Sequence, residues 1–265
     1  MPGSLHIITL VKWVPDAQLE RSIGENRRLD RAEGILGELD EYPLETALQI
    51  KENNDAADVR VSALTMGPSG ASTAVKKALQ IGADDGFHLN DEALAAADIS
   101  ATAAALAAAI GSVRDDGAAD YLVLAGMASD DGESGAVPAQ IAARLGVPAL
   151  TQSRSVVLDG DRLVVDRISG NRQQKVAAAL PAVVSVTDQA NDPRYPNFRA
   201  IMKAKKKPVT TLTLADLGLT GYAVESKIST ITAEPRPERE AGEIIHDHGD
   251  AGQQLVSFLA EEGLL

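Results

Sequence analysis

Residues 121–148, YLVLAGMASDDGESGAVPAQIAARLGVP, show the unit from which this chain is built. Residues 121–125 are an apolar run ended by Gly126, which is typical of a strand buried on both faces of a parallel sheet. A polar, glycine-rich loop follows, and apolar residues then recur at helical spacing until Gly146 and Pro148 end the helix. The stretch therefore predicts a strand, a loop and a helix in succession.

The loop between this strand and helix is predicted to lie at the carboxyl edge of the sheet. Backbone N–H groups at the start of a helix carry partial positive charge, which favours a phosphate or another anion. Gly132 and Gly135 allow a ligand to approach the backbone closely. The side chains of Ser129, Asp131 and Ser134 offer hydrogen bonds to ribose or base edges. The alternative is an ordinary strand-to-helix loop in which Asp and Ser form turns.

Three earlier segments repeat this alternation of strand and helix. The predicted strands are 5–11, 59–65 and 86–89, and the predicted helices are 39–52, 71–80 and 100–110. Right-handed crossovers between them give an α/β fold with a doubly wound, mostly parallel sheet and helices on both faces. The charged segment 20–38 is expected to be a loop or hairpin over the sheet. Lys12, directly after the first strand, either faces an anion or is solvated.

The order of strands and helices changes after residue 150. Asp159, Gly160 and Asp161 are a strong hairpin signal between two apolar runs. The predicted strands are 154–158, 162–168, 173–179 and 180–186. We therefore expect a β-hairpin insertion at 153–179, a return to the main sheet, and the end of the α/β domain near Thr187.

Composition limits the function. The chain has 265 residues, 45% of them hydrophobic, and its net charge of −13 argues against general nucleic-acid binding. Without cysteine there is no disulfide or thiolate, so a redox role requires a borrowed cofactor. Aromatic residues make up only 3%, which favours a flavin site shared with another chain. No signal peptide or membrane span is predicted, so we expect a cytoplasmic protein without direct membrane insertion.

GxGxxG and Walker patterns are absent from the glycine-rich turns, which excludes the common dinucleotide and P-loop fingerprints.

Residues 188–265 contain little apolar sequence. A short strand with a helical turn is predicted at 210–219, another strand at 226–231 and a helix at 253–264. These elements are too few to form a core of their own. We expect an extended arm that wraps another protein; packing of the tail against its own domain is the alternative.

A basic segment, NDPRYPNFRAIMKAKKKP at 191–208, precedes this arm. From 191 to 207 it has six basic residues and one acidic residue, in a chain whose net charge is −13. Pro193 and Pro196 stiffen it, and Phe198, Ile201 and Met202 are apolar groups in a predicted surface loop. Apolar side chains within a basic rim are typical of a docking site for an acidic partner.

This segment resembles the recognition loop of the β subunit of electron transfer flavoprotein, in which N-E-P-R-Y is followed by I-M-x-A-K-K-K. The resemblance covers nearly the whole chain. The other motifs that show it are VKWVPD, ETALQIKE, TMGPSGA, ALQIGADDGFHL, the loop after residue 121, and LPAVVSV. It implies an adenine-nucleotide-binding α/β fold and a heterodimer with an α subunit that holds most of an FAD. In that family the β subunit binds AMP and is an electron carrier subunit that has no catalytic activity by itself.

The resemblance also implies roles for particular residues. The cofactor-binding positions are Leu10, Gly37, Glu38, Leu39, Asp40, Met66, Gly126, Ser129, Asp131, Gly132, Ser134, Gly135, Ala136 and Val137. The positions that dock a dehydrogenase are Tyr195, Pro196, Phe198, Arg199, Ile201, Met202 and Lys203, with Phe198 in the place of the family's apolar anchor. Residues 1–187 are expected to be the nucleotide-binding domain, and 188–265 the recognition loop and the arm around the α subunit. Electrons are expected to come from flavin dehydrogenases, such as the acyl-CoA dehydrogenases of fatty acid β-oxidation, and to pass to a quinone oxidoreductase.

Two departures from the family pattern leave alternatives open. Residues 135–137 are Gly-Ala-Val where many members have Asn-Gln-Thr, so side-chain contacts to AMP are lost and a second FAD, as in electron-bifurcating relatives, is the alternative. Residues 169–172 are Ser-Gly-Asn-Arg in place of an acidic run, which suggests a paralogue with a different redox partner. A nucleotide-binding module without redox function is a further hypothesis. A metal hydrolase is a weaker one; it would use Asp130, Asp131 and Glu133, or else His246 and His248.

Overall fold

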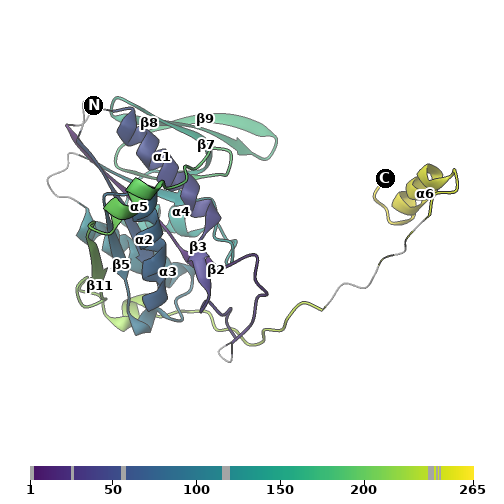
Figure 1. Cartoon of the computed structure of the whole chain (residues 1–265), viewed down its shortest axis with the longest axis horizontal. Coiled ribbons are helices and arrows are strands. Elements are labelled where there is room, and N and C mark those ends of the chain that lie inside the picture. Colours follow the sequence, from purple (N-terminus) through teal and green to yellow (C-terminus); the bar gives the residue numbers. More distant parts are fainter. Residues whose placement is uncertain are drawn as a thin grey trace. The chain divides into compact units, whose positions relative to one another are not determined.

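The computed structural model describes residues 3–24, 27–54, 58–114, 120–237, 242, 244 and 246–265. The chain divides into two compact units, Met1–Ala233 and Glu234–Leu265, which we treat separately. In the first unit, helix and strand alternate from residue 41 to residue 159, and further strands then follow directly up to residue 186. Figure 1 shows these helices packed around the strands. None of the helices in the described part of the chain has the length and apolar content that a membrane crossing requires.

The first unit contains a nine-stranded sheet with the order β11-β5-β4-β1-β6-β10-β7-β8-β9. The strands are β1 (Ser4–Leu10), β4 (Asp58–Met66), β5 (Asp85–Leu89), β6 (Asp120–Gly126), β7 (Ala149–Asp159), β8 (Arg162–Ser169), β9 (Arg172–Ala179), β10 (Ala182–Val186) and β11 (Val209–Leu212). Every neighbouring pair from β11 to β7 is parallel, whereas β7, β8 and β9 pair antiparallel. The prediction of a mostly parallel α/β sheet is confirmed.

Helices cover both faces of this sheet because its central strands are apolar on both sides. In β1, Leu5 and Ile7 belong to one buried cluster, and Ile8 and Leu10 to the other. The first cluster receives α1 (Glu41–Glu52) and α2 (Ser72–Ile81), and the second receives α3 (Ile99–Val113) and α4 (Val137–Leu145). The alanine-rich segment predicted as a helix is α3, whose alanines are mostly buried. This arrangement is the doubly wound one that the alternation predicted.

The charged segment after the first strand forms a small second sheet. In it β2 (Trp13–Pro15) pairs antiparallel with β3 (Gly34–Leu36). Ile23 and Leu29 form a further antiparallel bridge between these strands. The segment predicted as a loop or hairpin is therefore a strap with hairpin pairing, although residues 25 and 26 lie outside the described part.

The predicted hairpin is confirmed, and it continues the main sheet. Residues 149–153 of β7 pair with β10, and the strand then pairs with β8 up to its end. At this change of partner Gln152 has a φ of 59°, and the register shifts beside Ser153. Figure 1 shows β8 and β9 reaching outward from the rest of the sheet. The strand predicted to return to the main sheet is β10, and it lies inside the sheet, between β6 and β7.

The chain beyond Thr187 contributes to the first unit. β11 pairs with β5 at one edge of the sheet, so the compact unit extends to Ala233. The predicted surface loop contains a short helix, α5 (Phe198–Ala204), which packs against α2.

The strand predicted at 226–231 is wrong, because none of these described residues is in a strand. Instead, the backbone N–H of Lys227 donates to the Asp98 carboxylate, which also caps α3. The second unit contains the predicted C-terminal helix as α6 (Ala251–Glu261).

Candidate functional site

The parallel strands end together at one edge of the sheet. Thr9 lies beside Leu124, and Val186 lies beside Gly126, so β1, β6 and β10 finish at the same level. The short turn η1 (Glu38–Asp40) precedes α1 at this edge, and the loop after β6 precedes α4. The predicted cofactor-binding residues therefore lie along the carboxyl edge, where α/β folds bind ligands.

A buried carboxylate joins three segments at this edge. Asp131 accepts from Lys12 Nζ at 2.7 Å and from Arg31 Nε at 2.8 Å. Its side chain is only 1% exposed, whereas those of Lys12 and Arg31 are 41% and 35% exposed. Lys12 Nζ also donates to Ser129 Oγ at 3.1 Å. The loop after β6 is thus tied both to the end of β1 and to the strap.

The protonation of Asp131 follows from these contacts. Burial alone would raise the pKa of this carboxyl group, but the hydrogen bonds and positive charges of Lys12 and Arg31 outweigh it and lower the pKa to about 2. Asp131 is therefore ionised at neutral pH. Because its oxygens are occupied and its side chain is buried, it is not positioned to contact a ligand directly.

A second buried carboxyl group, Asp40, has the opposite character. The backbone N–H of Lys12 donates to Asp40 Oδ2 at 2.7 Å. Burial nevertheless raises the pKa of Asp40 to about 7, with a further rise from the charge of Asp130, against lowering contributions from Lys12 and Gly126. The neighbourhood is crowded, because a Cβ on Gly37 would lie 3.2 Å from Asp130 Oδ2 and 3.4 Å from Asp40 Oδ2.

The backbone at this edge requires glycine at two positions. A Cβ on Gly126 would lie 2.6 Å from the carbonyl oxygen of Leu39, so β6 and η1 approach each other closely only because no side chain intervenes. Gly135 has a φ of 60°, and a Cβ there would lie 2.9 Å from the Met127 carbonyl oxygen. The loop that both residues shape delivers the chain to the start of α4.

The start of α4 presents backbone N–H groups to the carboxyl edge. Within the described chain, no side chain caps this helix, which begins after Ala136. The Ser134 hydroxyl accepts from the Ala136 N–H at 3.4 Å, and Gly132 donates to Ser129 Oγ at 3.2 Å. An uncapped helix start is chemically suited to a phosphate.

The structure brings together some of the predicted cofactor-binding residues and not others. Those joined directly or through Lys12 are Gly37, Leu39, Asp40, Gly126, Ser129, Asp131 and Gly132. Ser134, Gly135, Ala136 and Val137 form the end of the same loop and the start of α4. Leu10 and Met66 pack with the second apolar cluster, and Glu38 is exposed at the start of η1.

Sequence reasoning missed Arg31 and left the role of Lys12 open. Arg31 lies in a segment that gave no motif. Only its charge, opposite a loop rich in Asp, could have pointed to the pairing with Asp131.

The basic segment predicted to dock a partner lies across the two helices that cover one face. Asn191 Nδ2 donates to the Tyr42 carbonyl oxygen at 3.0 Å and to Thr46 Oγ1 at 2.9 Å, both on α1. Arg194 pairs with Glu45 and Glu52 of α1, at 2.7 and 2.6 Å. The beginning of the segment is therefore fixed to α1.

The other end of the segment is fixed to α2. Lys207 Nζ donates to the carbonyl oxygens of Leu79, Gly82 and Ala83, at and just beyond the end of α2. Between the two ends, Asn197 caps α5 by accepting from the Ala200 N–H at 2.9 Å.

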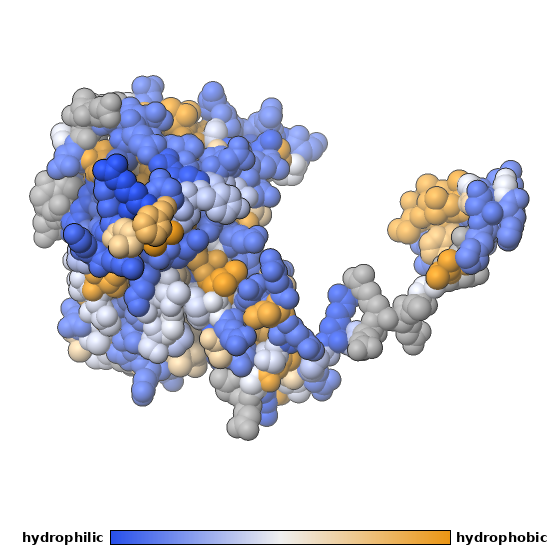
Figure 2. Space-filling view, in the orientation of Figure 1, coloured by the Kyte–Doolittle hydropathy of each residue, from blue (hydrophilic) through white to orange (hydrophobic). Residues whose placement is uncertain are grey.

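The fixed segment exposes apolar side chains. Tyr195 is 92% exposed, Phe198 78% and Met202 45%, while Ile201 is half-buried. Figure 2 shows apolar groups over α5 surrounded by strongly hydrophilic ones. Of the other predicted docking residues, Arg199 and Lys203 are exposed and Pro196 is half-buried. The geometry provides an apolar centre within a basic rim.

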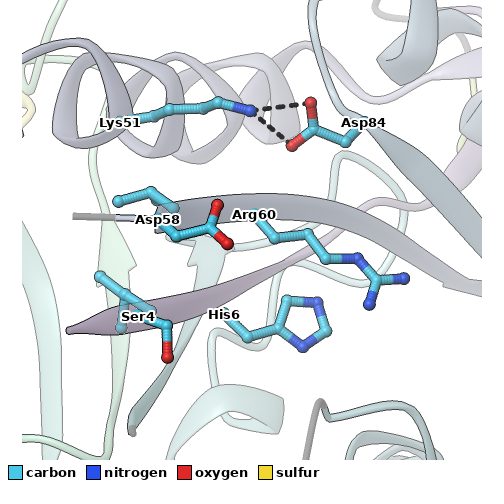
Figure 3. Close-up of a pocket in the computed structure, with 8 residues that line it drawn as sticks. Ser4, His6, Lys51, Asp58, Arg60 and Asp84 are labelled. Carbon is cyan, nitrogen blue, oxygen red and sulfur yellow. Dashed lines mark hydrogen bonds and ion pairs between the residues drawn. The ribbon is translucent and has the colours of Figure 1, made fainter. Parts of the chain in front are cut away.

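A separate pocket of about 310 Å³ lies at the opposite edge of the sheet, where β1 and β4 begin. Figure 3 shows Lys51 reaching from α1 to Asp84, and their atoms are 2.7 Å apart. His6 also lines this pocket, and its ring bonds to Ser62 Oγ. None of the residues predicted to bind a cofactor or a partner lines it. Among the described residues, no group of three or more acidic or His side chains is arranged to hold a metal ion.

Known proteins resemble this chain over most of its length. Residues 28–217 match the family described as "Electron transfer flavoprotein domain". The chain belongs to this family. "Electron transfer flavoprotein subunit beta" of Mycobacterium leprae is 40% identical over 270 residues, covering 98% of this chain and 99% of the relative. The protein of that name from Mycobacterium tuberculosis H37Rv is 39% identical over 268 residues, with the same coverage of 98% and 99%.

A relative with a different name is also similar to this chain over most of its length. "Caffeyl-CoA reductase-Etf complex subunit CarD" of Acetobacterium woodii is 32% identical over 269 residues, covering 98% of this chain and all of the relative. Membership of the family gives the chain a role in flavoprotein electron transfer and confirms the resemblance inferred from its motifs.

Proposed function

We propose that this chain is the β subunit of a heterodimeric electron transfer flavoprotein. It takes electrons from flavin dehydrogenases, such as acyl-CoA dehydrogenases, and passes them to a quinone oxidoreductase. The observation that carries this proposal is the segment 191–207, which is bonded to α1 and α2 at its ends and exposes Phe198 between them. Exposed apolar groups in an organised surface segment are characteristic of a docking site.

The chemistry of the flavin is supplied by FAD, which the α subunit holds in the main and which this chain helps to enclose. The chain itself contributes binding surfaces and electrostatics. Its docking segment brings a dehydrogenase close, and its rim charges favour an acidic partner. Such encounters bury little surface and dissociate quickly, which suits a carrier that must visit two partners in turn. We therefore propose that the chain is an electron carrier subunit that has no catalytic activity by itself.

We further propose that the carboxyl edge binds the phosphate of AMP at the start of α4. The residues present suit this group, because α4 begins without a side-chain cap among the described residues. Ser134 and the backbone of 132–137 would hold the nucleotide, since the oxygens of Asp131 are already bonded to Lys12 and Arg31. Asp131 and Ser129 then act by shaping the loop.

A second FAD in place of AMP is the alternative occupant of this edge. It is favoured by the absence of Asn-Gln-Thr at 135–137 and by the 32% identity to a subunit of a caffeyl-CoA reductase complex. Under that alternative the chain belongs to a bifurcating type of complex. A nucleotide-binding module without redox function remains the alternative of a different class.

The chain also supplies the surface for the α subunit. We propose that residues 1–187 form the nucleotide-binding domain, and that residues 188–265 supply the recognition segment and an arm that wraps the α subunit. In support, α6 has no buried residue, and Leu255, Val256 and Phe258 are each at least 50% exposed. Figure 2 shows apolar groups gathered on one side of this helix. An apolar face of this kind is suited to packing on another surface.

The test of the docking proposal is Phe198→Ala in the purified heterodimer. Loss of an exposed aromatic anchor should lower the rate of flavin reduction by the dehydrogenase about tenfold, without release of FAD. Stopped-flow absorbance gives the rate, and the flavin content of the purified complex provides the control. An unchanged rate would overturn the proposal.

The occupant of the carboxyl edge is tested by purifying the chain gently from its host and identifying the bound proteins and small molecules by mass spectrometry. One FAD, one AMP and an α subunit are expected. Two FAD and no AMP would favour the bifurcating type, and the absence of both flavin and partner would favour the binding module.

A further inference from the structure

The six basic residues of the docking segment fall into two groups. Arg194 and Lys207 are half-buried and bonded to the body of the protein. The other four are exposed, and no hydrogen bond or ion pair within the described part of the chain engages their side chains. They are Arg199, Lys203, Lys205 and Lys206. These four face solvent and are available to a partner, whereas Arg194 and Lys207 are bonded within the chain and need a different explanation.

Arg194 occupies one end of the segment and binds two carboxylates at once. Its Nε donates to Glu45 Oε2 at 2.7 Å, and its Nη1 donates to Glu52 Oε1 at 2.6 Å. Glu45 and Glu52 lie two turns apart on one face of α1, and the third guanidinium nitrogen, Nη2, donates to both at 3.0 and 2.9 Å. A planar guanidinium can bridge two carboxylates in this way, and a lysine ammonium cannot.

The protonation of this cluster agrees with the geometry. The bonds to Glu52 and Glu45 raise the pKa of Arg194 above its usual value. Burial opposes ionisation of Glu45, but its bonds to Arg194 outweigh that effect and lower its pKa. Because the side chain of Glu45 is only 5% exposed, its charge would be left buried and unpaired without Arg194.

Lys207 occupies the other end and binds three backbone carbonyl oxygens at and after the end of α2. A cation at a helix C-terminus is favoured by the helix dipole. The contact spans 124 positions or more in sequence, so it fixes the end of the docking segment to a distant element. Between Arg194 and Lys207, α5 is thus held against α2.

We propose that Arg194 and Lys207 are positioning residues, which hold α5 and the exposed Phe198 as a platform formed before the partner arrives. The inference rests on the proposed docking function. A loop that became ordered at each encounter would lose conformational entropy, and this loss would weaken binding. A brief electron-transfer contact buries too little surface to offset it. Because the segment is bonded to α1 and α2 before binding, that entropy is not lost at the encounter.

The experiment compares Arg194→Gln, Arg194→Lys and Lys206→Gln in the full heterodimer, with flavin reduction followed at several dehydrogenase concentrations and ionic strengths. For Arg194→Gln we expect the half-saturating dehydrogenase concentration to rise about fivefold, with the maximal rate and the salt dependence unchanged. Arg194→Lys should fall between Arg194→Gln and the wild type. Lys206→Gln removes an exposed rim charge and should instead reduce the salt dependence.

A structural measurement accompanies the kinetics. Amide hydrogen exchange at 198–204 should become about tenfold faster in Arg194→Gln and stay unchanged in Lys206→Gln. Glu52→Gln is a milder second variant, because Arg194 keeps its bond to Glu45. It should change the half-saturating concentration and the exchange rate in the same direction as Arg194→Gln, but less. Lys207→Gln releases the other end of the segment from α2, and it should likewise raise the half-saturating concentration and speed amide exchange at 198–204.

The outcomes separate this inference from the docking function itself. If Phe198→Ala has no effect on flavin reduction, the docking function fails. If Phe198→Ala weakens docking while Arg194→Gln does not, the platform is overturned and the docking function stands. A reduced salt dependence in Arg194→Gln would also overturn it, because Arg194 would then act as a rim charge.

Discussion

The loop after β6 and the segment after β10 leave neighbouring strands at the same edge of the sheet, yet they treat charge in opposite ways. The loop turns the carboxylate of Asp131 inward, where it is 1% exposed and bonded to Lys12 and Arg31. The segment binds the protein through Arg194 and Lys207 near its ends and keeps the charges between them outward, with Lys205 and Lys206 exposed beside α5.

This difference matches the two tasks that we propose for these segments, ligand binding and docking. A ligand site needs a loop that holds its shape without the ligand, and internal ion pairs provide that shape. A docking site needs exposed apolar and charged groups, so its order must come from its ends. Variants at Asp40, Asp131 and Phe198 test this contrast, with expected effects that decrease in that order.

Titration of Asp40 is expected to produce the largest effect on the free energy of unfolding. Its pKa is about 7 in the folded protein, against an ordinary value of 3.8, so the folded state holds the proton more tightly than the unfolded state. Stability from this group is therefore complete below about pH 4 and is lost as pH rises to about 7. The difference corresponds to about 4 kcal/mol, at about 1.4 kcal/mol for each pKa unit.

The measurement is urea unfolding from pH 4 to pH 8, comparing wild type with Asp40→Asn. The stability of the wild type relative to the variant should fall by about 4 kcal/mol as pH rises, since Asn does not titrate. The charged groups that set this response are Lys12 and Asp130. A constant difference across the range would show that Asp40 is ionised throughout.

Asp131→Asn is expected to produce the next largest effect. The change removes the carboxylate that joins Lys12 and Arg31, and it should lower the free energy of unfolding by about 2 kcal/mol at pH 7. The single tryptophan, Trp13, reports on this region, because its Nε1 donates to the Arg31 carbonyl oxygen at 2.9 Å.

Asp188→Asn provides the matched control for Asp131→Asn, because Asp188 is exposed. It should change the free energy of unfolding by less than about 0.5 kcal/mol. Equal losses in the two variants would mean that the ion pairs of Asp131 contribute nothing specific to the loop.

Phe198→Ala is expected to produce the smallest effect on stability. Because this side chain is 78% exposed, its removal should change the free energy of unfolding by less than about 0.5 kcal/mol. Thermal unfolding of the heterodimer measures this value. A large loss would show that Phe198 belongs to the packing of the protein, which would weaken its assignment to docking.

The sequence predicted the periodic parts of the fold well, because their signals are local. The strand at 121–125 and the helix ended by Gly146 were both correct, since Gly146 adopts a φ of 69° at the end of α4. The turn at 159–161 predicted the β7–β8 hairpin for the same reason.

Contacts between distant segments were not predicted. The pairing of Arg31 with Asp131 spans 100 positions, and the pairing of Arg194 with Glu45 spans 149. Nothing in either local pattern specifies the other partner. The helix α5 was missed for a related reason, because it is only seven residues long and is supported by α2.

The place of the docking segment in the chain also has a consequence for folding. It connects β10, inside the sheet, with β11, which completes the edge beyond β5. Bringing β11 to β5 closes a loop of more than 100 residues, and such non-local pairings form late. Arg194 and Lys207 can find α1 and α2 only once those helices are packed. We therefore expect the proposed docking surface to form among the last parts of the first unit, so that an incompletely folded chain does not present it to a partner.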